Sequence, residues 1–152
     1  MTEERFAVRP VREDDLNEWF RLRSLLWDEM PVEDHKEEMV DIIEHTDSQF
    51  VAVADLGDGR LAGFLEASIR PFVDDCSSEN VGYLEGWYVD SDFRRQGIGT
   101  AMVSMAETWA RTRGCTEMAS DAEIDNSGSI GAHRDLGYFE TSRLVHFRKD
   151  LI

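Results

Sequence analysis

Two apolar segments joined by a short glycine-containing turn constrain the fold most strongly. Phe50 to Asp55 and Leu61 to Ile69 have the length and character of buried strands, and Gly57-Asp58-Gly59 lies between them. Glycine permits the positive φ angles that a tight hairpin turn requires. The two longest apolar strands therefore form a hairpin, which favours an α+β (mixed α/β) fold with a mixed sheet.

Helical spacing of apolar residues predicts two helices before the hairpin and two after it. The first spans Asp14 to Met30 and is broken by Pro31. A strongly acidic second helix runs roughly from Glu33 to His45. A third begins near Ile98 and ends at Gly114, and a short fourth spans Asn126 to Leu136.

The remaining strands complete a predicted central sheet of six to seven strands, covered by helices on both faces. Phe6 to Arg9 is expected to be the first strand, and Val81 to Val89 is an aromatic-rich strand. Cys115 to Asp121 is a further strand, and Tyr138 to Lys149 supplies one or two closing strands. No linker or repeat divides the chain, so we expect residues 1–152 to form a single domain.

The charge balance limits the partners of the chain. Its 32 acidic and 16 basic residues give a formal charge of −16. This excess disfavours nucleic acid and anionic membranes, which bind basic surfaces, and suits a cationic small-molecule substrate. Every basic residue except Lys36 and Lys149 is an arginine. A salt-adapted or GC-rich source is therefore the alternative explanation of the acidity.

Cysteine usage and hydropathy indicate the compartment. Cys76 and Cys115 are too few for a disulfide framework, so we expect free thiols in a reducing compartment. No stretch has the roughly 18 apolar residues of a membrane span, and the start MTEERFAVRP lacks the pattern of a signal peptide. We therefore expect a cytoplasmic protein. The histidines show no metal-ligand spacing, so no metal site is predicted.

A loop rich in glycine and arginine, Arg94-Arg95-Gln96-Gly97-Ile98-Gly99-Thr100, lies between a predicted strand and a predicted helix. Glycines bring successive backbone N–H groups close to a ligand, and the helix adds the positive end of its dipole. The segment therefore predicts a pyrophosphate site, with an ordinary strand-to-helix turn as the alternative. It is neither a Walker A loop nor a Rossmann fingerprint.

With this loop the chain resembles the GCN5-related N-acetyltransferase superfamily, which carries Arg/Gln-x-x-Gly-x-Gly/Ala after its fourth strand. Arg94, Gly97 and Gly99 match that motif. The resemblance implies the superfamily's fold and acetyl-CoA as co-substrate, with the backbone of residues 95–100 around the pyrophosphate and that of residues 87–89 along the pantetheine. The cofactor-binding residues that it implies are Trp87, Tyr88, Val89, Arg94, Arg95, Gln96, Gly97, Ile98, Gly99 and Thr100.

Further segments resemble the small chromosomal aminoglycoside 6′-N-acetyltransferases of this superfamily. They are Leu25-Leu26-Trp27, Glu33-Asp34-His35, Tyr83-Leu84-Glu85-Gly86, Ala119-Ser120-Asp121, Asp125-Asn126 and Leu136-Gly137-Tyr138. By position, the resemblance implies that Trp27, Glu85 and Asp121 contact the aminoglycoside. It also implies that Asn126 contacts acetyl-CoA.

Two substrate-binding positions depart from the family pattern. The family's tyrosine in the loop after the third strand falls on Phe72, and its glutamate near the C-terminus falls on Ser142. Phe72 keeps the aromatic ring without the hydroxyl, and Ser142 lacks a negative charge that would face a cationic substrate. Both differences bear on which aminoglycosides are accepted.

Glu85 is the candidate general base. Acetyl transfer needs a neutral amine, so a bound ammonium must first lose a proton. Glu85 lies among apolar strand residues, two positions before the expected pantetheine segment, and takes this proton directly or through a water. The alternative is that Glu85 only binds the substrate ammonium. Asp121 ends a strand and is either a substrate contact or a helix-capping or turn residue.

His133 is the candidate acid for the CoA thiolate. Many superfamily members place a tyrosine four residues before the glycine that ends the last helix, and His133 holds that position here. It either protonates the thiolate or packs in the helix. Neither cysteine has a clear histidine partner, so direct transfer to the amine is expected. The resemblance also implies a homodimer, formed through the C-terminal strands or the acidic helices.

These features favour an enzyme that acetylates the 6′-amine of aminoglycosides with acetyl-CoA and thereby confers resistance. The alternatives are acetylation of another small amine, such as a polyamine or an amino acid, or of a protein N-terminus. A non-catalytic acyl-CoA-binding module is a third possibility. The intact glycine loop and Glu85 favour an enzyme over that module.

Overall fold

The computed structural model describes residues 6–152. The first five residues, which form part of the segment compared with a signal peptide, lie outside the described residues. The chain divides into two compact units, one ending at Ser120 and one running from Asp121 to Ile152. The described part contains no helix long and apolar enough to cross a bilayer.

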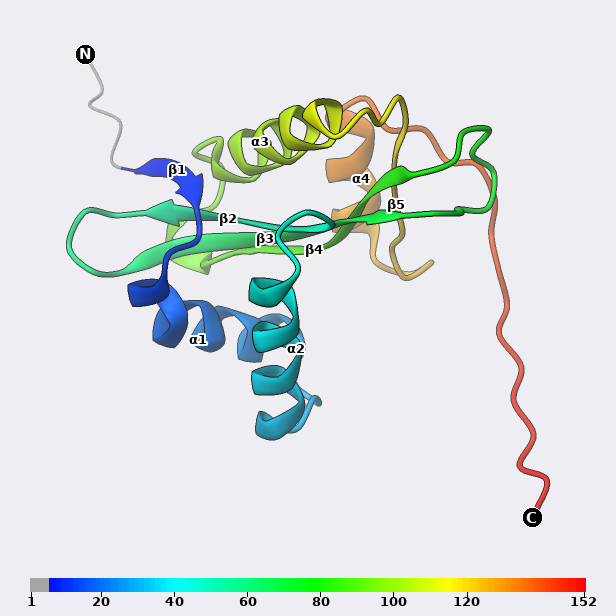
Figure 1. Ribbon diagram of the computed structural model, residues 1–152, viewed down its shortest axis with the longest axis horizontal. Helices are drawn as coiled ribbons and strands as arrows, with labels where there is room; N and C mark the ends of the chain where they lie inside the picture. Colours follow the sequence, from blue (N-terminus) through cyan, green and yellow to red (C-terminus); the bar gives the residue numbers. More distant parts are fainter. Residues whose placement is uncertain (1–5) are drawn as a thin grey trace. The chain divides into compact units, whose positions relative to one another are not determined.

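A five-stranded mixed sheet forms the centre of the first unit (Figure 1). Its strands follow chain order. The first four strands pair with one another antiparallel, and the fifth pairs parallel with the fourth. The strands are β1 (Ala7–Pro10), β2 (Gln49–Asp55), β3 (Leu61–Arg70), β4 (Val81–Val89) and β5 (Met118–Ser120). The predicted mixed sheet and its central hairpin are confirmed.

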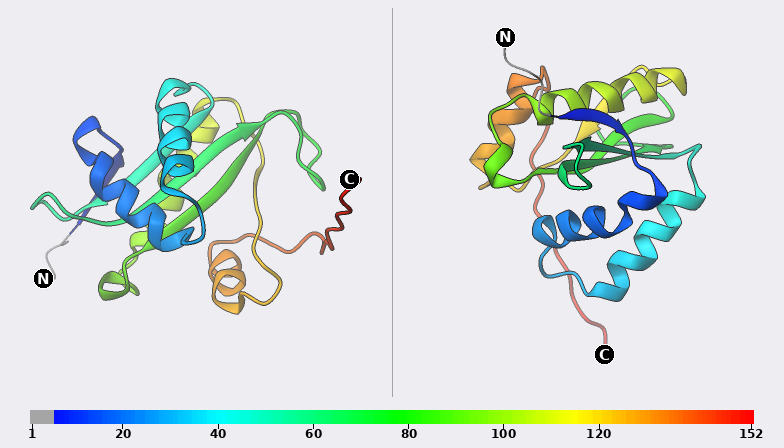
Figure 2. Two further views of the ribbon diagram at one scale, coloured as in Figure 1. Left: turned by 90° about the horizontal axis from the view of Figure 1, so that it is seen from below. Right: turned by 90° about the vertical axis from the view of Figure 1, so that its left-hand side faces the viewer.

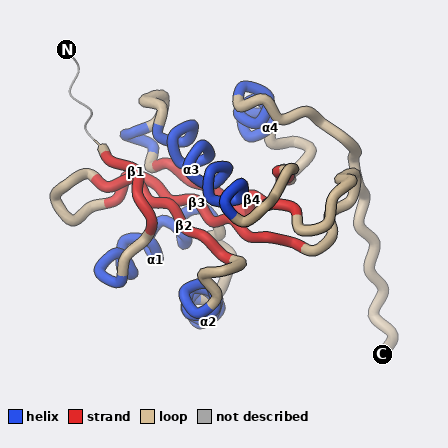
Figure 3. The backbone as a smooth tube through the Cα atoms, turned by 45° about the horizontal axis from the view of Figure 1, so that its top comes forward, coloured by secondary structure: helices blue, strands red, loops and turns tan. Residues whose placement is uncertain are grey.

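Helices cover both faces of this sheet (Figure 2). α1 (Leu16–Leu26) and α2 (Val32–Glu44) lie on one face, and α3 (Ile98–Thr112) lies on the other. Short 3-10 turns, η1 (Glu13–Asp15) and η2 (Ser91–Phe93), precede α1 and α3. The tube in Figure 3 shows the strands as a layer between these helices. The second unit contains α4 (Ser127–Asp135).

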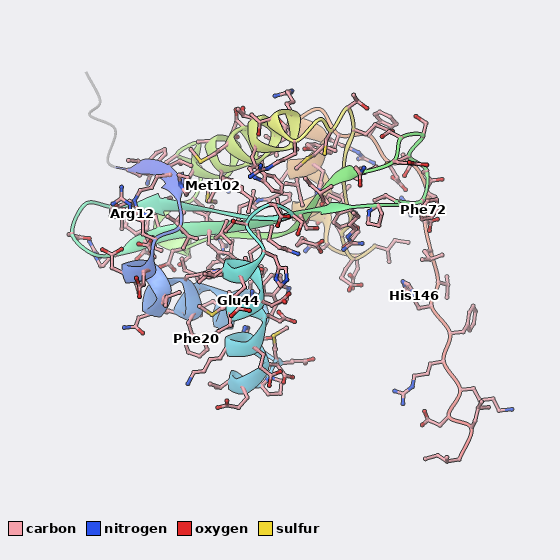
Figure 4. All side chains as sticks on the ribbon, viewed as in Figure 1. Arg12, Phe20, Glu44, Phe72, Met102 and His146 are labelled. Atoms are coloured by element: carbon pink, nitrogen blue, oxygen red, sulfur yellow. The ribbon has the colours of Figure 1, made fainter. Side chains whose placement is uncertain are left out.

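Apolar side chains fill both interfaces between sheet and helices. Trp19 and Leu22 of α1 and Phe64 of β3 are fully buried in one cluster. On the opposite face, Met102 of α3 is fully buried and is labelled in Figure 4. Burying a side chain of this size contributes about 1.5–3 kcal/mol, so the apolar face of each helix is stabilised against the sheet.

Two predicted boundaries near the start of the chain shift in the structure. The first helix ends at Leu26 and not at Met30, because Trp27 leaves the helical conformation with φ −115° and ψ 68°. β1 includes Pro10, which was expected to end the strand. Since β1 lies at the edge of the sheet, a proline there removes no central ladder bond.

The expected closing strands in Tyr138 to Lys149 are wrong for the described chain. The sheet has five strands and not six to seven, and no strand is described after Ser120. Residues 138–152 form neither helix nor strand, and Phe139, Val145 and Phe147 are at least 73% exposed. Alternating apolar residues indicate that a segment can form a strand, but a strand also needs a partner for its backbone groups.

A bidentate ion pair attaches β1 to the turn before α1. Arg9 Nη1 and Nη2 donate to the two carboxylate oxygens of Asp15 at 2.7 and 2.9 Å. The backbone N–H of Arg12 donates to the same carboxylate at 2.7 Å. Arg9 also donates to Asp55, at the end of β2. These bonds, led by those from Arg9, lower the pKa of Asp15.

We expect Asp15→Asn to destabilise the fold at neutral pH by about 1–3 kcal/mol, because the amide cannot pair with Arg9. A carboxylate with a lowered pKa stabilises the folded state above its unfolded pKa near ~3.9, and this contribution is lost as the pH falls. The difference between wild type and variant should therefore shrink below about pH 4. Urea unfolding across pH 3–7 measures it.

Glu13→Gln is the matched control, because Glu13 lies exposed in the same turn. It should leave the free energy of unfolding close to that of wild type. If Asp15→Asn proved as stable as Glu13→Gln at pH 7, the ion pair would not be the attachment of β1.

Candidate active site

Glu85 lies at an irregularity in β4. Glu66 of β3 pairs with Gly86, and the next residue, Ala67, pairs with Leu84. Glu85 is therefore the extra residue of a β-bulge. Bulges bend a strand and redirect a side chain, and they occur often beside active sites. No sequence pattern predicted this bulge.

The Glu85 carboxylate is already hydrogen-bonded within the protein. Ser68 Oγ donates to Oε1 at 2.6 Å, and Arg70 donates from Nε to Oε1 at 3.0 Å and from Nη2 to Oε2 at 2.7 Å. The expectation that Glu85 lies among apolar residues is therefore wrong for its side chain. Ser68 and Arg70 alternate along β3, so both reach the same face of the sheet.

The far half of β4 has one open edge. β5 pairs with β4 only from Gly82 to Leu84. Among the described residues, therefore, 85–89 have no strand partner on that side. Residues Trp87, Tyr88 and Val89, predicted to bind pantetheine, lie along this edge and are each half-buried. An extended ligand can add to a strand edge as a further strand would.

The predicted phosphate loop leads directly into α3. Gly97 is the N-cap residue and has φ +83°, a left-handed conformation that favours glycine. The first N–H groups of a helix have no partner within the helix, so those of Ile98, Gly99 and Thr100 face the space beyond its end. An anion is bound well there. Arg95 also has a positive φ, of 64°.

Arg94 and Trp87 connect this loop to the open edge of β4. Arg94 Nε donates to the carbonyl oxygen of Val89 at 2.9 Å, and its guanidinium lies 5.4 Å from the ring centre of Tyr88. A Cβ placed on Gly99 would lie 3.7 Å from Trp87 Nε1. The structure therefore brings the predicted pantetheine and pyrophosphate residues together. Gln96 is exposed between them.

Trp27 packs against β4 directly beside Glu85. A Cβ placed on Gly86 would lie 2.5 Å from Trp27 Cζ2 and 3.2 Å from Leu26 Cδ2. Only glycine therefore allows this approach. The structure thus brings together two of the predicted substrate-binding residues, Trp27 and Glu85.

A buried polar network fixes the backbone around Trp27. Arg23 is fully buried, and its Nε donates to His35 Nδ1 at 3.2 Å. Because a guanidinium only donates, His35 carries its proton on Nε2, which lies 3.2 Å from the carbonyl oxygen of Trp27. Arg23 also lies over the Trp27 ring and pairs with Glu66 and Glu38.

Phe72 lies in the loop between β3 and β4 and is 73% exposed (Figure 4). The far part of this loop is held by Glu117, which accepts the backbone N–H groups of Ser77 and Ser78 at 2.9 and 2.7 Å. These bonds, with that of the Ser78 hydroxyl first, lower the pKa of Glu117. The loop is therefore anchored at one end by β3 and at the other by Glu117.

The remaining predicted residues lie in the second unit. Asp121 is its exposed first residue, and Ser142 is exposed in the C-terminal segment. Asn126 caps α4, since its Oδ1 accepts the backbone N–H of Ser129 at 3.0 Å. The amide NH2 of Asn126 is then the part that can donate to a ligand.

His133 bonds within its own helix. Its Nδ1 lies 2.7 Å from the carbonyl oxygen of Ser129, so Nδ1 carries the proton. A neutral His133 then presents Nε2 without a proton, and only the imidazolium can act as an acid through Nε2. Its ring also meets Tyr138 edge to face, with 5.9 Å between centres. Both roles of His133, as an acid and as a packing residue, remain predictions.

No group of three or more His, Cys, Asp or Glu side chains suited to a metal ion occurs in residues 6–152. Both cysteines are free in the structure, with Cys115 buried. Burial raises the pKa of both thiols, and Glu117 adds to the shift at Cys76. Neither thiol is thereby favoured as a nucleophile.

The chain matches known proteins along most of its length. The model of the acetyltransferase (GNAT) family matches residues 19–138. An aminoglycoside N(6')-acetyltransferase type 1 of Klebsiella aerogenes is 44% identical over 146 residues, which cover 95% of this chain and 96% of that protein. A protein of the same description from Acinetobacter baumannii is 40% identical over 147 residues, covering 95% and 98%.

Solved structures agree with these sequence relatives. AAC(6')-Iy in complex with the bisubstrate analogue CoA-S-monomethyl-acetylneamine has a TM-score of 0.90 and 33% identity, covering 97% of this chain and 99% of that one. The apo 6'-N-acetyltransferase AAC(6')-IG from Acinetobacter haemolyticus has a TM-score of 0.88 and 37% identity, covering 96% and 99%.

Ser68, Arg70 and the network around Arg23 are the site residues that sequence analysis missed. The alternation of Glu66, Ser68 and Arg70 along a predicted strand was the available signal, because it places three polar side chains on one face. Their partners in β4 and α1 follow only from the register of the sheet and the packing of the helix.

We expect Gly86→Ala to displace Trp27, because the indole ring cannot bend away from a Cβ at 2.5 Å. Overpacking of this kind lowers the free energy of unfolding by about 1–3 kcal/mol. Urea unfolding followed by far-UV circular dichroism measures it. Adding Trp27→Leu to Gly86→Ala should recover part of the loss, because the smaller side chain leaves room for the Cβ.

Gly131→Ala is the matched control, since nothing lies within 4 Å of a Cβ there and the residue is within α4. It should keep or raise stability through helix propensity. Equal stability of Gly86→Ala and wild type would show that Trp27 does not rest on Gly86.

Proposed function

The chain belongs to the acetyltransferase (GNAT) family, and we propose that it transfers the acetyl group of acetyl-CoA to the 6′-amine of aminoglycoside antibiotics and so confers resistance. The observation that carries the proposal is the position of Glu85, redirected by a bulge beside Trp27 and next to the open edge of β4. The relatives named above are described as acetyltransferases of that amine and support it.

Glu85 acts on the attacking amine. An aminoglycoside amine is largely an ammonium at neutral pH, so it must pass a proton to a base before it attacks. The amine nitrogen then forms a bond to the thioester carbonyl carbon, the C–S bond breaks and CoA leaves as its thiolate. In this proposal Glu85 accepts the proton, and Trp27, Phe72, Asp121 and Ser142 are the residues that bind the substrate.

Acetyl-CoA, when bound, supplies the activated acetyl group. The first N–H groups of α3 and the turn at Gly97 suit its pyrophosphate, and the stretch of β4 beyond its pairing with β5 suits its pantetheine arm. A backbone N–H near Val89 can polarise the thioester carbonyl. Asn126 contacts acetyl-CoA in this assignment, and His133 protonates the thiolate only as an imidazolium.

We propose that residues 1–152 act as one acetyltransferase domain, because the family match from 19 to 138 extends across both compact units. The free cysteines support a cytoplasmic location. The acidic charge supports a cationic substrate and argues against nucleic acid and anionic membranes as partners.

We also propose a homodimer that forms through the C-terminal segment. Val145 and Phe147 are at least 73% exposed and alternate with His146 and Arg148, as in a strand with one apolar face. Since no strand partner is described for this segment within residues 6–152, the edge of a second copy can supply one. Exposed Val40 and Ile43 mark the acidic helix α2 as the competing surface.

The function is tested by release of CoA thiol with aminoglycosides that carry a 6′-amine, with counterparts that carry a 6′-hydroxyl, and with spermidine. We expect turnover with the 6′-amines alone. Glu85→Gln should lower kcat by about 100-fold or more, the range of general-base catalysis. Turnover with spermidine alone, or no turnover with any of these amines, would refute the proposal.

The dimer is tested by the mass in solution of the Val145→Asp/Phe147→Asp variant. We expect a dimeric wild type and a monomeric variant, because two charges on the apolar face would prevent strand pairing. Val40→Asp/Ile43→Asp is the comparison and should remain dimeric. The reverse pattern would move the interface to α2, and a monomeric wild type would refute the dimer.

A further inference from the structure

The two oxygens of the Glu85 carboxylate are not equivalent. Oε1 accepts hydrogen bonds from Ser68 Oγ at 2.6 Å and Arg70 Nε at 3.0 Å. Oε2 accepts one bond, from Arg70 Nη2 at 2.7 Å. A carboxylate oxygen has about two acceptor directions, so Oε1 is saturated and Oε2 keeps one direction open.

Arg70 is itself held in place. Its Cζ lies 3.5 Å from the centre of the Tyr83 ring, and Tyr83 is buried. A guanidinium stacked on an aromatic face keeps its plane fixed, and its two parallel N–H bonds then fix the plane of the carboxylate. Arg70 is the last residue of β3, so its backbone is fixed by the sheet as well.

We propose that Arg70, assisted by Ser68, is a positioning residue that makes Oε2 of Glu85 the one oxygen that receives the proton of the substrate amine. This inference rests on the proposed function for its substrate. Arg70 acts through Glu85 and not on the amine. The positive charge of Arg70 also balances the negative charge of Glu85. Selection of the amine therefore depends more on its geometry relative to Oε2 than on charge attraction.

This role predicts a loss of kcat without any rise in KM. In Arg70→Met only the Ser68 bond to Oε1 remains, so the plane of the carboxylate is no longer fixed. We expect kcat with a 6′-amino aminoglycoside to fall about 10- to 100-fold, as for a misplaced catalytic group. The charge of Glu85 is then unbalanced and attracts the cationic substrate more strongly, so KM should stay equal or fall. Arg70→Lys keeps the charge without the planar pair of donors, and should keep KM while kcat remains low.

Arg60→Met is the matched control. Arg60 precedes β3 at its opposite end, is exposed and pairs with Asp58. The substitution removes the same charge and the same side chain from a position just before the strand that ends at Arg70. Both kcat and KM should keep their wild-type values, so a change shared with Arg70→Met would be an effect of net charge and would overturn the assignment.

The decisive measurement repeats Arg70→Met in a Glu85→Gln background. Near pH ~9 more of the amine is already neutral, which raises the residual rate. If Arg70 acts through Glu85, it causes no further loss of kcat in that background. An equal loss in both backgrounds, or a raised KM with unchanged kcat, would overturn the proposal.

A second readout does not depend on turnover. In an NMR spectrum of the protein labelled with 15N-arginine, the Nε–H signal of Arg70 is the one that is present in wild type and missing in Arg70→Met. It should be protected from solvent exchange in wild type and lose that protection in Glu85→Ala, which has no side-chain acceptor. An unchanged signal would overturn the inference even if the enzyme is active. Absence of turnover in a wild type that shows the protected signal would instead refute the proposed function.

Discussion

A buried carboxylate, Glu66 in the middle of β3, determines how the helices meet the sheet. It is 5% exposed and accepts bonds from Trp19 Nε1 at 2.9 Å and from Arg23 Nη1 at 2.6 and 2.7 Å. Burial raises the pKa of this carboxyl, and Arg23 and Trp19 act in the opposite direction. Removing one member of such a pair leaves a buried charge at a cost of about 3–5 kcal/mol. α1 therefore has one position on β3 in which these donors are satisfied.

The same constraint reaches the candidate site through Arg23. Its guanidinium contacts His35 and Glu38 of α2 and the ring of Trp27. The end of α1 is therefore set by polar contacts with α2 as well as by helix propensity. Trp27 then rests on Gly86, directly opposite Glu66 in the strand register. One wall of the site thus depends on a network that lies beneath the helices.

Local patterns predicted the elements, and distant pairings account for what they missed. Apolar periodicity and the positions of the glycines located α2 and the hairpin to within about one residue, and the end of α3 to within about two, because these signals act over a few positions. The phosphate loop was predicted for the same reason.

The bulge at Glu85 and its pairing with Arg70 depend on the register between β3 and β4, which no local pattern contains. The closing strands failed because alternation in residues 138–149 does not specify a partner. The roles of Asp121, Asn126, His133 and Ser142 remain predictions from resemblance.

Glu66 and Glu85 show how one chemical arrangement serves two purposes on one face of the sheet. Each is a carboxylate that accepts two bonds from a single arginine and one from a neighbouring donor. The Glu66 side chain is 7% exposed and pairs with Arg23, a buried residue of α1. The Glu85 side chain is 29% exposed and pairs with Arg70, at the end of β3. Burial gives Glu66 a structural role, because without Arg23 its negative charge would be left unpaired and away from water. Partial exposure lets Glu85 keep its orientation while one acceptor direction stays open to a ligand. The bulge produces this difference, since it moves Glu85 out of the regular alternation of β4 and leaves Gly86 to face Trp27.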